Sequence, residues 1–173
     1  VDDHNGWVDA DPDLWRTRDG GETWTRLEPS AKPYRVLRFA DIDTGFGLNG
    51  VEGSPWAPPY TLMRTGDGGV SWSPVELVPE WQQAIWISDD GTTLWVVGVA
   101  GQIARSIDGG YTWSPIASPT SETLTNVSFA DLHHGWAAGV NGTLLLSTDG
   151  GQTWRLVDPG TDEEITQLAL AGW

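Results

Sequence analysis

The chain has 173 residues, no cysteine and 12 tryptophans, and its 24 acidic and 9 basic residues give a formal net charge of −15. The missing cysteines exclude disulfides, thiolate metal sites and a cysteine nucleophile, and the negative charge disfavours nucleic acid and anionic lipid as partners. Because 22 Gly and 11 Pro punctuate the chain and no apolar run could span a bilayer, the composition indicates one acidic, Trp-rich β domain.

One phrase occurs four times and sets the organisation of the chain. It has the form Ser/Thr-x-Asp-Gly-Gly-x-Ser/Thr-Trp, and its Asp positions step by 48, 41 and 41 residues, a period typical of repeat architectures. The phrase predicts a tight β-hairpin, because the glycines tolerate positive φ and the carboxylate can accept backbone N–H bonds of its own turn. This structural role is favoured over metal binding or acid catalysis for the repeated residues, which are Asp19, Trp24, Asp67, Trp72, Asp108, Trp113, Asp149 and Trp154.

Aligning the repeats predicts four-stranded antiparallel blades in chain order. The first blade comprises residues 1–28 and lacks its innermost strand. The second, 34–77, has strands over 34–40, 45–48, 62–65 and 71–77, and the third, 81–117, over 83–88, 93–99, 102–106 and 112–116. The fourth, 123–158, has strands over 124–130, 135–140, 143–147 and 153–157. Such units predict an all-β propeller, in which each tryptophan ring of the repeated phrase packs against the neighbouring blade.

The two ends of the chain match in phase. Residues 165–170 align with the innermost strand 124–129 of the fourth blade, and residues 1–7 align with residues 130–136, which lead from that strand into the second one. We therefore expect residues 164–173 to pair inside the first blade and to close a ring of four blades, so that residues 1–173 form a single propeller domain.

The repeated phrase resembles the Asp-box, or bacterial neuraminidase repeat, of sialidases, xyloglucanase-type glycosidases and sortilin-type receptors. The longer pattern Phe-x-Asp-x-x-x-Gly-Trp, running on to the Asp-box at 129–154 and in part at 39–72, is similar to the propellers of photosystem II assembly and stability factors. This resemblance covers nearly the whole chain. It implies a propeller that acts as a non-catalytic scaffold for a protein partner, and members of that family usually have seven blades.

Catalytic and metal-binding constellations are not evident in the sequence. A sialidase resemblance would imply an arginine cluster and a Tyr/Glu nucleophile pair, but Arg16, Arg64 and Arg105 occupy one repeated register and are expected to partner nearby carboxylates. His4, His133 and His134 lie in loops between the first two strands of blades and are interpreted as polar loop residues. We expect no enzyme activity, no cofactor and no metal site.

The contact surface is expected at the edge of the blades opposite the Asp-boxes. There the first period is lengthened by an insertion, 51–60, in which prolines stiffen a loop that carries Glu52, Trp56 and Tyr60. The acidic turn with Glu163 shares this edge. The alternative for Trp56 is that its ring folds onto its own blade and is not available to a partner. A protein partner is favoured; the alternative is a carbohydrate-directed propeller, either a glycosidase fragment or a glycan-binding module. The acidity favours an extracytoplasmic location.

Overall fold

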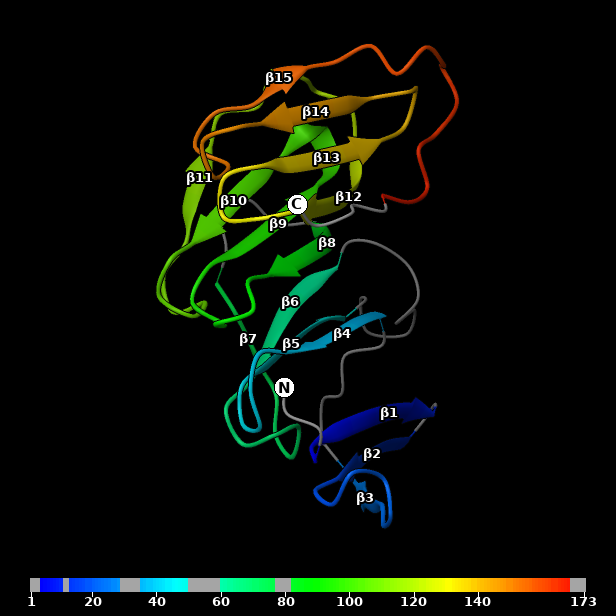
Figure 1. The fold of residues 1–173 in the computed structure, drawn as a ribbon, viewed down its shortest axis with the longest axis vertical. Helices are drawn as coiled ribbons and strands as arrows, with labels where there is room; N and C mark the ends of the chain where they lie inside the picture. Colours follow the sequence, from blue (N-terminus) through cyan, green and yellow to red (C-terminus); the bar gives the residue numbers. More distant parts are fainter. Residues whose placement is uncertain (1–3, 11–12, 29–34, 50–59, 77–81, 169–173) are drawn as a thin grey trace. The chain divides into compact units, whose positions relative to one another are not determined.

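The computed structural model describes residues 4–10, 13–28, 35–49, 60–76 and 82–168. The chain divides into two compact units, Val1–Glu76 and Leu77–Trp173. Both units are built from antiparallel sheets whose strands follow one another along the chain. Figure 1 labels the strands of each unit.

The first unit contains two sheets. The first sheet has the order β1-β2-β3, formed by Gly6–Ala10, Asp13–Thr17 and Thr25–Leu27. The second sheet has the order β4-β5-β6-β7, formed by Arg35–Phe39, Gly45–Asn49, Thr61–Thr65 and Ser73–Pro74. Strand β5 is buried over its first four residues, whereas the short strand β7 is exposed, so burial falls toward the last strand of the sheet.

The second unit also contains two sheets. One sheet has the order β8-β9-β10-β11, formed by Gln82–Ile87, Leu94–Gly98, Ile103–Ser106 and Ser114–Ile116. A short 3-10 helix, η1, spans Val99–Gly101 between β9 and β10. The other sheet has the order β12-β13-β14-β15, formed by Leu124–Phe129, Gly135–Gly139, Leu144–Ser147 and Arg155–Leu156.

The four sheets confirm the predicted fold class, an all-β structure of propeller blades. The meander order and the positions of the first three strands of the last blade agree with the sequence to within one residue. The fourth strand is shorter than expected, two residues in place of five, because residues up to 154 belong to the turn of the repeated phrase. Among the described residues, the first sheet has three strands, as the missing innermost strand predicts.

The expected terminal strand over 165–170 is wrong for its described part, residues 165–168, which form no strand. The backbone groups of Ile165 are used within the second unit: its amide donates to the carbonyl of Gly139 at 3.1 Å, and its carbonyl accepts from the side chain of Asn126 at 3.2 Å. Figure 1 shows this segment (red) returning alongside the last sheet. Ring closure by the two ends, and a single domain over 1–173, stay predictions.

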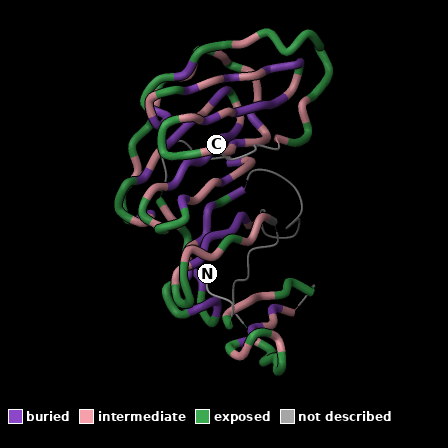
Figure 2. The backbone as a smooth tube through the Cα atoms, in the orientation of Figure 1, coloured by how far each residue is buried: buried purple, intermediate pink, exposed green. Residues whose placement is uncertain are grey.

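The core of the second unit lies between its two sheets. Buried side chains from both sheets form one cluster: Trp95, Val97, Ile103, Leu124, Val127, Phe129, Ala137, Leu145 and Trp154. Figure 2 shows the inner strands buried and the turns exposed. The rings of Trp95 and Phe129 are 4.0 Å apart between centroids, so aromatic contact joins the two blades.

The Phe and Gly of the longer sequence pattern face each other across two strands. Phe129 is the register partner of Gly135, and Phe39 is the partner of Gly45. A Cβ at Gly135 would lie 2.3 Å from the Phe129 ring, and one at Gly45 would lie 2.6 Å from the Phe39 ring. Glycine is therefore needed because the aromatic ring lies across the opposing backbone.

The tryptophan rings of the repeated phrase were expected to pack against the neighbouring blade. The structure shows that they also contact their own blade. Trp72 and Trp154 lie edge-on to the phenylalanine of their own blade, with centroids 6.0 Å and 5.8 Å from Phe39 and Phe129. Both also belong to clusters with residues of the preceding blade. Trp24, by contrast, is 40% exposed. The ring that bridges two blades is instead a strand tryptophan, as in the stack of Trp7 on Phe39 at 3.7 Å.

Candidate functional site

The turn of the repeated phrase is held by a compact set of hydrogen bonds. In the last blade, the hydroxyl of Ser147 donates to Asp149 Oδ1 at 2.8 Å and accepts the amide of Gly151 at 2.8 Å. The two carboxylate oxygens of Asp149 accept the amide and the hydroxyl of Thr153 at 2.9 Å and 2.6 Å. The carboxylate therefore caps the turn, as the sequence predicts.

The indole N–H adds a contact that the sequence reasoning missed. Trp154 Nε1 donates to the carbonyl of Gly151 at 3.1 Å and closes the turn from its far end. The same bond forms in the other three repeats, from Trp24 to Gly21, from Trp72 to Gly69 and from Trp113 to Gly110. The fixed spacing of three residues between the second Gly and the Trp was the signal for it.

These hydrogen bonds stabilise the ionised carboxylates. The side-chain hydrogen bond from Thr23 is the main cause that lowers the pKa of Asp19 to about 2, and the bond from Thr112 does the same for Asp108. The pKa of Asp149 is also lowered, chiefly by Thr153. The carboxylates thus cap the turns in their ionised form.

A second carboxylate caps the turn between the first two strands of a blade. Asp131 Oδ1 accepts the amides of His133 and His134 at 2.6 Å and 2.7 Å, and Asp131 Oδ2 lies 2.8 Å from His134 Nδ1. The His134 side-chain bond is the main cause that lowers the pKa of Asp131 to about 2. Within the part of the chain that the structure describes, no group of three or more His, Asp and Glu residues could hold a metal.

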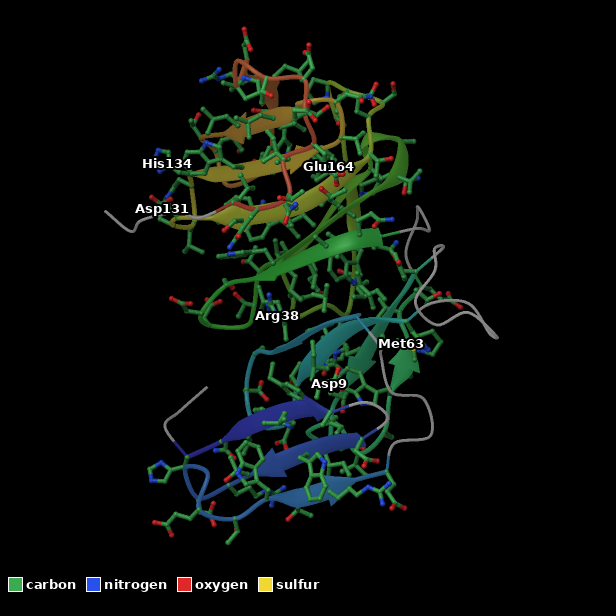
Figure 3. All side chains as sticks on the ribbon, turned by 90° about the vertical axis from the view of Figure 1, so that its right-hand side faces the viewer. Asp9, Arg38, Met63, Asp131, His134 and Glu164 are labelled. Atoms are coloured by element: carbon green, nitrogen blue, oxygen red, sulfur yellow. The ribbon has the colours of Figure 1, made fainter. Side chains whose placement is uncertain are left out.

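The two kinds of turn lie together at one edge of each blade. The amide of Gly150, in the repeated phrase, donates to the carbonyl of His133 at 2.9 Å, and equivalent bonds join Gly20 to His4, Gly68 to Asp43 and Gly109 to Thr92. Figure 3 shows Asp131 and His134 together at this edge, away from Glu164. We call the turns 88–93, 107–112, 131–134 and 148–153 the turn face of the second unit.

A groove of about 430 Å³ opens on the turn face between β8 and β12, and we call it the acidic groove. It is lined by Trp86, Ile87, Ser88, Asp89, Asp90, Phe129, Ala130, Asp131 and Leu132. Three carboxylates and two aromatic rings thus meet where two blades adjoin. The sequence analysis missed this site because the groove forms between two blades, and the alignment of repeats does not show which side chains of neighbouring blades meet.

Large apolar side chains are exposed on the same face. Leu132 is 55% exposed at the groove, while Ile107 and Tyr111, in the third repeated phrase, are 67% and 73% exposed. The bond from Gly109 to the carbonyl of Thr92 holds their turn beside the turn that carries Asp89 and Asp90. Exposed apolar groups around a groove are typical of a binding surface.

The first unit has a smaller pocket of about 250 Å³, lined by Arg16, Arg18, Thr23, Thr25, Leu27 and Val70. Arg16 is 4% exposed; its guanidinium lies 5.3 Å from the centroid of Trp7 and donates to the carbonyl of Ile42 at 2.8 Å. Burial is the main cause that lowers its pKa. Arg105 likewise lies 5.2 Å from the centroid of Trp95.

The expected nearness of the repeated arginines to carboxylates is seen at Arg16: burial lowers its pKa, while the charges of Asp43 and Asp67 oppose that shift. The contacts of these arginines with aromatic rings were not predicted. Arg64, like Arg16 and Arg105, lies over an aromatic ring, 5.9 Å from the centroid of Phe46. The planar guanidinium stacks on a strand ring that the repeat supplies at the second position of β1, β5 and β9.

Two of the four residues expected to make the contact surface, Tyr60 and Glu163, lie in the described part of the chain. Glu52 and Trp56 lie outside the described residues. Tyr60 is 3% exposed, so its buried ring is not a surface contact, which corrects the expectation for this residue. Glu163 is exposed, and its carbonyl accepts the amide of Gly142 at 2.9 Å.

The four sheets and the capped turns define an Asp-box β-propeller. Residues 82–157 and 111–170 match the family model described as photosynthesis system II assembly factor YCF48. The match spans more than half of the chain, and the chain belongs to this family. No curated protein sequence gives a significant match. Among the described residues we find no helix with the length and apolar character needed to cross a bilayer.

Solved structures share this fold. YCF48 from Cyanidioschyzon merolae is 20% identical with a TM-score of 0.60, and the match covers 88% of this chain and 52% of that one. An ancestral GH74 enzyme is 15% identical with a TM-score of 0.64, covering 91% and 23%. The GH74 enzyme of Niastella koreensis is 16% identical with a TM-score of 0.60, covering 86% and 26%. The chain thus spans about half the length of YCF48 and about a quarter of each GH74 enzyme.

Proposed function

We propose that this chain is a non-catalytic propeller module that binds another protein. The observation that carries the proposal is membership of a family described as an assembly factor, because the matched residues, 82–170, take in both sheets of the second unit. An assembly factor works by contact with proteins, and the chain would do the same.

The turn face offers a surface suited to that function. Ile107, Tyr111 and Leu132 expose apolar area there, and the acidic groove supplies a concave site with carboxylates at its rim. Protein interfaces commonly combine an aromatic or aliphatic centre with polar groups around it. The opposite edge, where Glu163 is exposed, is the competing contact surface.

Carbohydrate binding is the second candidate function. It is favoured by one observation, the presence of Trp86 beside the carboxylates of Asp89, Asp90 and Asp131 in one groove. Carboxylates and an aromatic ring are also what a sugar site uses. The GH74 structures share the fold, which by itself does not transfer an activity.

The experiment that tests the function pans random peptides displayed on phage against the immobilised chain, and assays the same preparation on a panel of xyloglucan, other β-glucans and sialosides. We expect enrichment of a peptide consensus that binds in solution by fluorescence anisotropy, with no glycan hydrolysis. Failure to enrich any peptide would count against protein binding. Saturable glycan binding or turnover would establish the carbohydrate alternative.

We also propose that the chain works outside the cytoplasm, because strong net acidity is common among exported proteins that must stay soluble. Cell fractionation of the native host, followed by immunoblotting of each fraction, tests this location. Recovery with cytoplasmic markers would contradict it.

A further inference from the structure

We propose that the acidic groove of the second unit receives an extended, lysine- or arginine-bearing segment of the partner protein. This inference rests on the proposed function and names the chemistry of the partner.

The groove has a fixed aromatic wall. The ring of Trp86 lies 5.1 Å from Phe129 and 5.3 Å from Trp95, measured between centroids, so two core rings hold it in place. Trp86 is only partly buried and lines the groove. A wall that is already ordered loses little side-chain entropy when a segment binds to it.

The charge of the groove selects a cation. Asp90 and Asp131 cap turns, but Asp89 is exposed and forms no hydrogen bond or ion pair with the described residues. The groove lining contains three Asp residues and no Lys or Arg. A carboxylate next to an indole ring attracts an ammonium or guanidinium group, through both the ion pair and the ring.

The surroundings of the groove indicate a polypeptide rather than a small cation. The groove volume of about 430 Å³ could accommodate a side chain or two, and Leu132, Ile107 and Tyr111 extend the apolar surface beyond it. An extended segment with alternating basic and apolar residues can fill the groove and cover these side chains together. The net charge of −15 repels nucleic acid and anionic lipid, because these are negatively charged as well.

The experiment compares two labelled peptides, acetyl-Gly-Leu-Lys-Leu-Lys-Leu-Gly and its counterpart with Glu in place of Lys, by fluorescence anisotropy. The central variant is Asp89→Lys, and its control is Glu163→Lys, which changes the net charge by the same amount at the other edge. A second pair is Leu132→Ser and Ile42→Ser; Ile42 is exposed at the equivalent repeat position of the β4–β5 turn. Circular dichroism checks that every variant is folded.

We expect the Lys peptide to bind the native chain and the Glu peptide not to bind. Asp89→Lys should weaken Lys-peptide binding by roughly tenfold, because a favourable pair becomes a repulsive one, and should allow the Glu peptide to bind. Leu132→Ser should weaken binding by about two- to fivefold. The control Glu163→Lys should change binding much less than Asp89→Lys does. The control Ile42→Ser should change it much less than Leu132→Ser does.

Equal effects of Asp89→Lys and Glu163→Lys would overturn the inference, since they would reveal non-specific attraction to an acidic protein. A larger effect of Glu163→Lys would move the contact to the opposite edge. If the display experiment enriches peptides that lack basic residues and ignore Asp89→Lys, protein binding stands and this inference fails. If no peptide binds at all, the proposed function fails as well.

Discussion

Glycine has different physical roles in the last repeated turn and in the segment that follows the last strand. Gly151 has a φ of +76° and approaches the preceding blade so closely that a Cβ would lie 2.1 Å from Trp95 Nε1. Gly160 has the same φ of +76° but nothing within 4 Å of its Cβ position. The pair separates the cost of a left-handed backbone from the cost of crowding between blades.

We therefore expect Gly151→Ala to destabilise the chain more than Gly160→Ala. The second change introduces only the left-handed conformation, at about 1–2 kcal/mol. The first adds the clash with a core indole, which typically costs about 1–3 kcal/mol more. Urea unfolding followed by circular dichroism gives both values, and equal free-energy losses would show that the indole moves aside.

The turn carboxylates make stability depend on pH in acid. The pKa values of Asp19, Asp108 and Asp131 are lowered to about 2 from an ordinary 3.8. A carboxylate with a lowered folded-state pKa stabilises the fold above its unfolded pKa, and this stabilisation is lost as the pH falls through the folded value. The loss therefore falls between about pH 4 and pH 2.

The test compares the native chain with Asp131→Asn, whose amide can still accept backbone N–H bonds but cannot titrate. We expect the melting temperature of the variant to be lower at pH 7 and the difference to shrink as the pH falls to 2. Thermal melts in matched buffers measure it. A difference that does not change with pH would mean that ionisation of Asp131 does not stabilise the turn.

At the scale of the strand, the repeat made the fold readable from sequence. The Asp-Gly-Gly phrase predicted the hairpin between the last two strands of each blade, and the alignment placed β12, β13 and β14 to within a residue. The contacts between strands were not predictable in this way. The packing of the Phe129 ring over Gly135 depends on side-chain direction, which a period does not specify.

The candidate site was predicted less well than the fold. Glu163 was named, but the acidic groove was not, because Trp86 and Asp89 come from one blade and Leu132 from the next, and the repeat does not specify which side chains meet between blades. Tyr60 was misjudged, since an aromatic residue next to an insertion was interpreted as exposed, while the structure buries it beside β6.

We predict that the contact of β12 with β13 tolerates no side chain at Gly135. Gly135→Ala would place a Cβ 2.3 Å from the Phe129 ring and should cost about 1–3 kcal/mol. Phe129→Leu lowers the stability by itself, but it removes the ring atoms with which the new Cβ would clash. The loss of unfolding free energy in the double variant should therefore be smaller than the sum of the losses in the two single variants, by about 0.5–3 kcal/mol. Chemical denaturation of all four chains measures this, and strict additivity would contradict the contact.

At the scale of the molecule, the question is whether the two units unfold together or separately. Closure of a four-bladed ring by the chain ends is a prediction from their matching phase, and the chain spans about half of YCF48 from Cyanidioschyzon merolae. If the ring closes, both units share interfaces and unfold together.

Differential scanning calorimetry tests this prediction. We expect one transition for the full chain and two transitions after deletion of residues 164–173, because removal of the closing segment would uncouple the units. Two transitions already present in the full chain, with the deletion affecting only the second unit, would show that the ends do not close a ring.

The aromatic cluster of the second unit has an optical consequence. The indoles of Trp86 and Trp95 lie 5.3 Å apart at an interplanar angle of 65°, close and oblique enough for their electronic transitions to couple. Coupled indoles give a paired positive and negative band in circular dichroism, which disappears when the rings separate. Because Trp86 also lines the acidic groove, a ligand that shifts this ring would alter the same bands. The second unit thus carries an intrinsic spectroscopic reporter of both its folding and its occupancy.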